Sequence, residues 1–225
     1  MRLLRGVRSR LDHFWRLYVL RDQFYRTVTK WFADDGDATL RLDYPLDASS
    51  VVFDVGGYRG DFADAIFKRF GCRVFIFEPV PEYHAHCLKR FSGNPAITCL
   101  NYGLAASTGS FLMKISEDAS SFTRDIEAGR TLRASVRGAI EAVDALGVET
   151  IDLIKINIEG GEFELLPAMI DSGLVRRTKY IQIQFHNFVA GAVKARNDIR
   201  SKLGATHREM WCYPFVWESW ERMNS

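Results

Sequence analysis

From residue 51 onward, short apolar runs typical of strands alternate with amphipathic segments typical of helices. The first run, 51–55, is rich in β-branched and apolar side chains, as is usual for a strand buried on both faces. Strands that alternate with helices in this way form a parallel sheet with helices on both sides. The chain is therefore predicted to form a single α/β domain with a doubly wound, mostly parallel, seven-stranded, Rossmann-like sheet.

The limits of the individual elements follow from the same patterns and from their stop signals. Strands are expected at 51–55, 74–77, 97–102, 151–157 and 180–186, and residues 206–221 should form an antiparallel pair that closes the sheet. Helices are expected at 61–70, 81–92, 138–146, 163–172 and 192–203. Two further strands, at 110–116 and 131–137, should flank an exposed loop. Pro167 predicts that the regular part of helix 163–172 begins late.

The N-terminal segment has a different character. Apolar residues spaced at threes and fours predict one amphipathic helix over 2–32, whose other face is rich in arginine. Residues 1–30 hold eight Lys/Arg and two Asp, so +6, whereas the whole chain carries +2. Two interpretations remain open: a helix laid across the domain with a solvated face, or contact with an anionic membrane surface or an acidic partner. We expect 1–37 to be this helix and a loop, and 38–225 to be the α/β domain.

Composition narrows the cellular setting. The four cysteines form no C-x-x-C pair and no metal-ligand rhythm, which favours free thiols in a reducing compartment. No apolar run approaches the ~20 residues of a membrane span. Charges interrupt the basic N-terminus, so a secretory signal is not expected. These features predict a cytoplasmic protein, with membrane association through the N-terminal helix left open. The small net charge points to no nucleic-acid partner, and the oligomeric state stays undetermined.

A glycine-rich turn, Asp54-Val-Gly-Gly-Tyr-Arg-Gly60, joins the first strand to the first helix. Glycines let the backbone turn tightly and approach a ligand, and the helix N-terminus offers free N–H groups. Glu78 ends the next strand, about 20 residues beyond the turn, where a carboxylate can accept hydrogen bonds from both hydroxyls of a ribose. An unliganded turn and a solvated acid are the structural alternatives. The two elements together predict a nucleoside cofactor.

The turn also bears on which cofactor is bound. Its spacing is Gly56-Gly57-x-x-Gly60, which differs from the G-x-G-x-x-G of dinucleotide sites. Asp54 stands near the end of the first strand, where a negative charge would oppose a pyrophosphate. The same charge suits the cationic amino end or sulfonium of S-adenosyl-L-methionine. The sign argument therefore favours this methyl donor over NAD(P).

A second polar group surrounds the end of strand 151–157 and comprises Asn157, Glu159 and Glu162, with Lys155. This end should face the same crevice as the glycine turn. Lys155 is costly in an apolar strand unless it is paired or reaches solvent, so a structural salt bridge is one interpretation. Glu162 also favours the start of the next helix through the macrodipole. The other interpretation gives the group a role in acceptor binding or proton removal.

His186 ends the strand at 180–186 on the same edge of the sheet. It is a candidate base or hydrogen-bonding group, with a purely structural histidine as the alternative. His84 and His86 are interpreted as surface residues. Aromatic residues alternate at 211–217, where one face should carry Trp211, Tyr213, Phe215 and Trp217. This face either packs in the core or forms a wall for a flat or sugar-like acceptor.

These segments resemble the FkbM-type methyltransferase family. The matching motifs are Val-Phe-Asp-Val-Gly-Gly-x-x-Gly at 52–60, Phe-Glu-Pro at 77–79 and Asp-Leu-Ile-Lys-Ile-Asn-Ile-Glu-Gly-Gly-Glu at 152–162. The resemblance covers about 50–190 and implies a class I methyltransferase that uses S-adenosyl-L-methionine, often on a hydroxyl of a sugar or natural product. It implies cofactor contacts at Asp54, Gly56, Gly57, Tyr58, Gly60, Glu78 and Pro79, and places Asn101, Gly103 and Leu104 near the adenine.

The chain departs from the family at three positions. Asn157 stands where aspartate is usual, and Gln184 where glutamate is common. An amide cannot act as a base and is a poorer cation ligand than a carboxylate, so no catalytic metal is expected. Any proton would then go to Glu159, Glu162 or His186, with Asn157 kept in the predicted catalytic set. Tyr58 replaces a frequent asparagine, which alters the methionine end of the predicted site.

The resulting prediction is O-methylation of a small hydroxylated acceptor by in-line displacement, in which the protein mainly aligns the reactants. A non-catalytic, methyltransferase-like binding module is the first alternative, and the two amide replacements are its support. An NAD(P)-dependent reductase is the second. It requires a proton-donating Tyr/Lys pair near the crevice, and none stands at a recognisable spacing.

Overall fold

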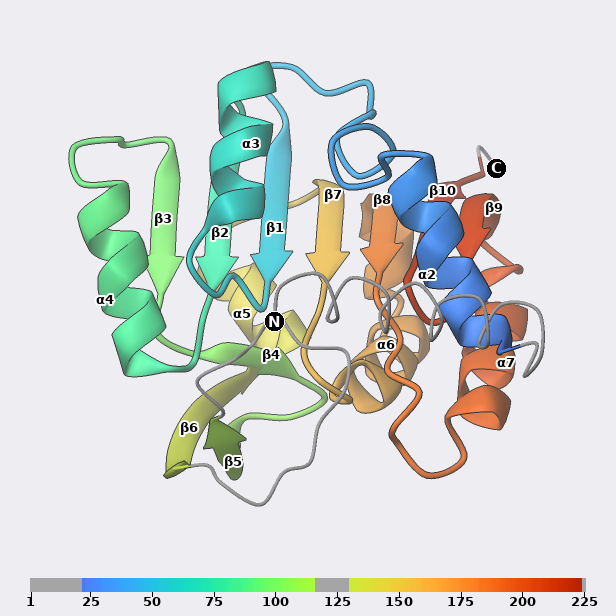
Figure 1. Ribbon diagram of the computed structural model, residues 1–225. Coiled ribbons are helices and arrows are strands. Elements are labelled where there is room, and N and C mark those ends of the chain that lie inside the picture. Colours follow the sequence, from blue (N-terminus) through green and yellow to red (C-terminus); the bar gives the residue numbers. More distant parts are fainter. Residues whose placement is uncertain (1–21, 116–129, 224–225) are drawn as a thin grey trace, which may run out of the picture.

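A seven-stranded sheet is the centre of the computed structural model, which describes residues 22–115 and 130–223 (Figure 1). In spatial order its strands are β3 (Ile97–Leu100), β2 (Arg73–Phe77), β1 (Val51–Val55), β7 (Ile151–Ile156), β8 (Thr178–Ile183), β10 (Trp217–Arg222) and β9 (His207–Tyr213). The first five are parallel, and β10 runs antiparallel to both of its neighbours. The predicted α/β fold with a mostly parallel, seven-stranded sheet is confirmed.

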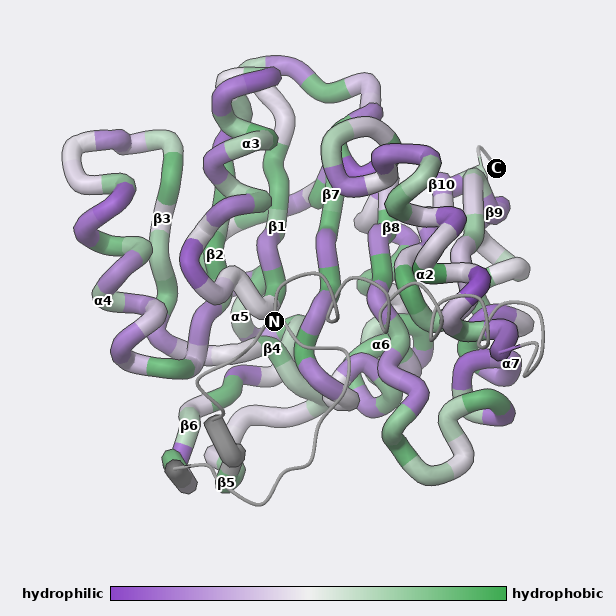
Figure 2. The backbone as a smooth tube through the Cα atoms, in the orientation of Figure 1, coloured by the Kyte–Doolittle hydropathy of each residue, from purple (hydrophilic) through white to green (hydrophobic). Residues whose placement is uncertain are grey.

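Helices cover both faces of the sheet. The helices after the glycine turn are α3 (Asp61–Phe70), α4 (Pro81–Arg90), α5 (Ala139–Ala145), α6 (Glu162–Asp171) and α7 (Ala192–Leu203), with a short 3₁₀ turn, η2 (Leu174–Arg177). Side chains alternate along β1: Val52 packs with Ile66 of α3, whereas Phe53 packs in the opposite cluster with Leu165 of α6. In Figure 2 the central strands are largely hydrophobic, and hydrophilic stretches appear toward their lower, carboxyl ends, at mid-height in the picture. Polar groups therefore gather at one edge of an apolar sheet.

The first described helix, α2 (Gln23–Ala33), packs on the hairpin formed by β9 and β10. Its Trp31 is buried, with ring centroids 5.8 Å from Trp211 and 5.0 Å from Tyr213. This confirms helix within the 23–32 part of the predicted segment, while 1–21 lie outside the described residues. Across residues 22–115 and 130–223, no helix combines the length and apolar character needed to cross a bilayer.

The aromatic residues of the closing hairpin pack in the core, but they do not all share one face. Trp211, Tyr213 and Trp217 join Trp31 in one apolar cluster. Phe215 was expected on the same face, but it lies in the turn between β9 and β10 with φ of 61° and packs against the larger cluster. A positive φ interrupts the alternation of a strand, so the expected row of four aromatics is wrong at Phe215.

A small second sheet lies beyond the carboxyl ends of the main strands (Figure 1). It consists of β4 (Gly103–Ala105), β6 (Arg130–Gly138) and β5 (Gly109–Ile115), in that order. The strands expected at 110–116 and 131–137 are present here, and most of the loop expected between them falls in the undescribed 116–129. The strand expected at 97–102 ends at Leu100, and the chain then turns into β4.

Helix α6 begins at Glu162, so the late start predicted from Pro167 is wrong. Proline removes one helical hydrogen bond, which would otherwise run to the carbonyl of Phe163. The helix continues because its inner face is buried, with Leu165, Leu166 and Met169 fully inside the core. Tertiary packing of an apolar face outweighs one lost hydrogen bond.

Candidate active site

The candidate site lies at the carboxyl ends of β1 and β7. From β1 the chain proceeds outward to β2 and β3, and it returns on the other side of β1 as β7. Such a reversal of strand order is where open α/β sheets bind ligands. The predicted site residues that follow β1, β2, β7 and β8 are therefore brought to one edge of the sheet.

The glycines of the turn are required by close packing. Gly56 has φ of 80°, and a Cβ there would lie 1.9 Å from the carbonyl oxygen of Asn157. A Cβ on Gly57 would lie 2.2 Å from the side chain of Ile76. Gly60, also with φ of 80°, precedes α3 and would meet the ring of Phe91 at 2.6 Å. The turn is thus packed closely against the residue that follows β7, against β2 and against the end of α4.

Asp54 and Lys155 form a buried ion pair on neighbouring strands. Lys155 Nζ lies 2.9 Å from Asp54 Oδ1 and donates to the carbonyl of Gly56 at 2.7 Å. Burial lowers the pKa of Lys155, and the contact with Asp54 opposes that change. The salt-bridge interpretation of Lys155 is confirmed. It also corrects the sign argument for the cofactor, because the negative charge of Asp54 is already balanced within the fold.

Two buried oxygens at this edge have no hydrogen-bond partner within the described part of the chain. They are Asp54 Oδ2 and Asn157 Oδ1. Buried polar atoms are nearly always satisfied, so each such atom calls for an explanation. Both lie where β1 and β7 end, and the backbone N–H of Asn157 donates to Val55 at 3.0 Å. A ligand that brings hydrogen-bond donors into the crevice would satisfy them.

Glu78 is buried at the end of β2, beside the glycine turn. Its Oε2 accepts from Tyr58 N at 2.7 Å, and its Oε1 accepts from Val80 N at 2.8 Å. Burial raises the pKa of Glu78 to about 7, although both backbone bonds act to lower it. Each carboxylate oxygen retains capacity for a second donor. Tyr58 has φ of 51°, a region that asparagine tolerates better than tyrosine.

The residues predicted near the adenine have separate environments. Asn101 is exposed and donates to the backbone oxygen of Glu78 at 3.1 Å. Gly103 lies in β4, and a Cβ on it would be 3.5 Å from the Pro79 ring. Leu104 is buried in the core, so its side chain is not available to a ligand. Arg137 was not predicted to lie here; its guanidinium is 4.5 Å from the ring centre of Tyr102.

The four predicted catalytic residues differ in position. Glu162 is fully buried; its Oε1 accepts from His186 N and lies 2.9 Å from His186 Nδ1, and its Oε2 accepts from Gly160 N. Both oxygens are thus engaged inside the protein. Glu159, with φ of 53°, is half exposed and lies 3.9 Å from His186 Nε2. Glu162 therefore orients His186 and is not placed to take a proton from an acceptor.

The loops that follow β7 and β8 contact one another next to His186. A Cβ on Gly160 would lie 3.0 Å from Val189 and 3.9 Å from the ring of Phe188. The Phe188 ring lies 5.2 Å from the His186 imidazole and is 59% exposed. Phe188 was not among the predicted site residues, although an aromatic side chain in the loop after a strand end could have indicated it. Gln184 precedes this loop and is buried, with its N–H donating to Ile156 at 2.9 Å.

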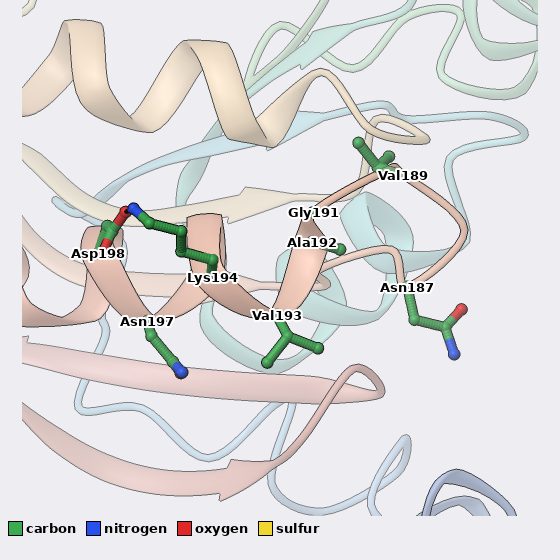
Figure 3. A pocket seen from close by; sticks show the side chains of 8 residues that line it. All are labelled: Asn187, Val189, Gly191, Ala192, Val193, Lys194, Asn197 and Asp198. Atoms are coloured by element: carbon green, nitrogen blue, oxygen red, sulfur yellow. Dashed lines mark hydrogen bonds and ion pairs between the residues drawn. The ribbon is translucent and has the colours of Figure 1, made fainter.

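A hollow of about 670 Å³ begins one residue beyond His186, between the loop and α7 (Figure 3). Asn187, Val193 and Asn197 project toward the same side, whereas Lys194 reaches back to pair with Asp198. None of the predicted site residues lines this hollow. In residues 22–115 and 130–223, no group of three or more His, Cys, Asp or Glu side chains is arranged to hold a metal ion.

The fold and the polar residues at the carboxyl ends of the strands define a methyltransferase-type α/β protein. Comparison with known proteins identifies its family. The profile of the methyltransferase FkbM domain matches residues 54–211. This range contains the glycine turn, Glu78, the Asn157–Glu162 loop and His186. The chain belongs to the FkbM methyltransferase family.

Individual relatives are distant. The hexuronic acid methyltransferase AglP of Haloferax volcanii is 23% identical over 177 residues, which span 78% of this chain and 67% of AglP. A structure from Clostridium thermocellum, provisionally assigned as an rRNA methylase, is 10% identical with a TM-score of 0.51 and covers 85% of this chain and 97% of its own. NodS, an N-methyltransferase of Bradyrhizobium japonicum solved with S-adenosyl-L-homocysteine, is 12% identical with a TM-score of 0.47, covering 93% and 92%. The Clostridium structure shows that the fold is shared.

Proposed function

We propose that the protein is an S-adenosyl-L-methionine-dependent methyltransferase that methylates an oxygen on a small, hydroxylated, sugar-like or natural-product-like acceptor. The main support for this choice of cofactor is the buried carboxylate of Glu78, which accepts hydrogen bonds from two backbone N–H groups beside the glycine turn. The acceptor class is supported by the family and by the similarity to AglP, a hexuronic acid methyltransferase.

The residues at the switch point fit this cofactor. Glu78 has two acceptor positions left for the hydroxyls of a ribose. The unpaired Asp54 Oδ2 and Asn157 Oδ1 would accept from the cofactor's amino group or from an acceptor hydroxyl. S-adenosyl-L-methionine would supply an already activated methyl group, so the chain's task is to align the acceptor and exclude water.

His186 is the proposed proton acceptor. Its Nδ1 faces the buried carboxylate of Glu162, which favours the ring form with the proton on Nδ1 and a lone pair on Nε2. Nε2 is then the nitrogen able to accept a proton from an acceptor hydroxyl. Base catalysis typically contributes 10²–10⁴-fold, so the activated donor would still permit slow transfer without it.

A non-catalytic binding module is the second candidate. Its support is that amides, Asn157 and Gln184, stand at the crevice where the family commonly has carboxylates. An amide keeps the shape of the pocket and loses the ability to take a proton. Such a module would bind S-adenosyl-L-methionine and show no turnover with any acceptor.

Calorimetric titration with S-adenosyl-L-methionine, with NADH in parallel, tests the cofactor. Micromolar binding of the methyl donor alone supports the proposal; preference for NADH would point to a reductase. Glu78→Ala should abolish binding while circular dichroism shows a folded protein, and unchanged binding would refute the role of Glu78. His186→Ala should spare binding and lower turnover about 10²-fold or more. Tight binding without turnover across hydroxylated acceptors would favour the binding module.

A further inference from the structure

Three side chains next to the proposed cofactor site have no role in the proposed binding of the cofactor. This group comprises Glu159, on the loop after β7, and His186 and Phe188, on the loop after β8. The two loops pack closely, since a Cβ on Gly160 would lie 3.0 Å from Val189. Glu162, fully buried, bonds to the backbone of both loops, at Gly160 N and His186 N. The backbone that carries these three side chains is therefore fixed by hydrogen bonds to a buried carboxylate.

The side chains of this group differ in chemistry. His186 presents Nε2, because Nδ1 is engaged by Glu162. Phe188 presents a ring that is 59% exposed and 5.2 Å from the imidazole. An exposed aromatic ring next to hydrogen-bonding groups suits a ligand that has both an apolar face and hydroxyls. A saturated sugar ring has this combination.

The charge of the group restricts the ligand further. Carboxylates flank His186 on both sides: Glu162 at 2.9 Å from Nδ1 and Glu159 at 3.9 Å from Nε2. Glu159 is 47% exposed, so its carboxylate is accessible from solvent beside His186. A third negative charge a few ångströms away is repelled, and an ammonium group is attracted.

We infer that Glu159, His186 and Phe188 form an acceptor subsite for an uncharged or amine-bearing sugar ring, with Glu159 selecting against carboxylated acceptors. The inference rests on the proposed function and adds the charge class of the acceptor. The ring lies on Phe188, and the hydroxyl to be methylated donates its hydrogen bond to His186 Nε2. On this basis a uronic acid, the type of acceptor named for AglP, is a poor ligand here.

The test uses the full chain saturated with S-adenosyl-L-homocysteine. Methyl glycosides are titrated in neutral, amine and carboxylate forms of the gluco, galacto and manno rings, while NMR follows the ring signals of His186 and Phe188. Neutral and amine forms should shift both signals. Carboxylate forms should bind roughly tenfold more weakly, as expected for one added repulsion near the surface. Glu159→Gln should reduce this difference to about twofold or less.

Matched variants separate local from general effects. Glu149→Gln removes the same charge from an exposed residue before β7, at the opposite end of that strand, and should keep the tenfold discrimination. Phe188→Ala should weaken sugar binding about tenfold, as loss of an aromatic contact does. Phe32→Ala, at a 61% exposed ring near the end of α2, should not.

Two outcomes would overturn the inference. In the first, carboxylated sugars bind the wild-type protein as tightly as neutral sugars do. In the second, no sugar shifts the His186 signal while S-adenosyl-L-homocysteine is bound. Binding of S-adenosyl-L-homocysteine is measured first. If it fails, the proposed function itself is lost. If it holds and charge discrimination is absent, only the acceptor subsite is refuted.

Discussion

At the scale of single residues, the site is dominated by buried carboxylates whose surroundings differ. Asp54 is paired with Lys155, and Glu162 is saturated by backbone and histidine donors. Glu78 has two N–H donors and, among residues 22–115 and 130–223, no cation in contact. Burial raises the pKa of Glu78 to about 7 in the free protein. The charge of Glu78 can therefore change near neutral pH.

Glu78 should make cofactor binding pH-dependent. Its folded pKa of about 7 exceeds the ordinary 4.5, so it contributes stability that is full below pH 4.5 and is lost as the pH rises to about 7. Two ribose hydroxyls added to the two N–H donors favour the ionised form. Affinity for S-adenosyl-L-methionine should therefore fall about fivefold to tenfold from pH 8 to pH 6. Calorimetry checks this, and Glu78→Gln should bind weakly with little change over that range.

The ion pair between Asp54 and Lys155 should matter for stability more than for charge recognition. Lys155→Met leaves a carboxylate buried without its cation, which should cost about 3–5 kcal/mol in the free energy of unfolding. Adding Asp54→Asn removes the buried charge and should recover most of that loss. Chemical denaturation measures both variants. A single variant that loses under about 1 kcal/mol would show that water reaches the pair.

At the scale of elements, the sequence predicted what depends on local pattern. Strand 51–55 and helices 61–70 and 192–203 have the limits expected from periodicity and glycine stop signals. The predictions were wrong where packing between distant segments determines the structure. At Pro167 the helix continues because the inner face of α6 is buried. The pairing of Lys155 with Asp54 joins residues about a hundred positions apart, so spacing alone left it as one of several interpretations.

Substitutions in the turn after β1 can separate the cost of a steric clash from the cost of backbone strain. Gly56→Ala places a Cβ 1.9 Å from the Asn157 carbonyl, and its φ of 80° adds strain. Gly93→Ala has a matching φ of 82° with no atom within 4 Å. We expect a cost of about 1–2 kcal/mol at Gly93, which is the strain alone. Gly56→Ala should cost several kcal/mol more or prevent folding, as measured by urea denaturation. Equal costs would mean that the turn moves freely from β7.

At the scale of the whole molecule, the candidate site combines residues that no single motif contains. Glu78, Asn157 and His186 come from three strand ends, and their convergence follows from the sheet order. Because parallel strands end at one edge, the sequence could predict this neighbourhood. The roles within it could not be predicted, since the burial of Glu162 and the exposure of Phe188 depend on how two loops pack against each other.

The distribution of charge over the chain leads to a last prediction. Residues 1–30 carry +6 and the remainder −4, while the apolar face of α2 is already occupied, with Trp31 buried against the closing hairpin. Membrane attraction through the basic residues 1–30 should therefore be electrostatic, without insertion of the apolar face of α2. The full chain should sediment with vesicles containing anionic lipid at 50 mM salt, and release at about 500 mM, where the Debye length falls to a few ångströms. Neutral vesicles are the control, and a chain lacking residues 1–21, which carry six Arg and one Asp, should not bind either type. Binding that survives high salt would show that apolar insertion, not charge, drives the contact.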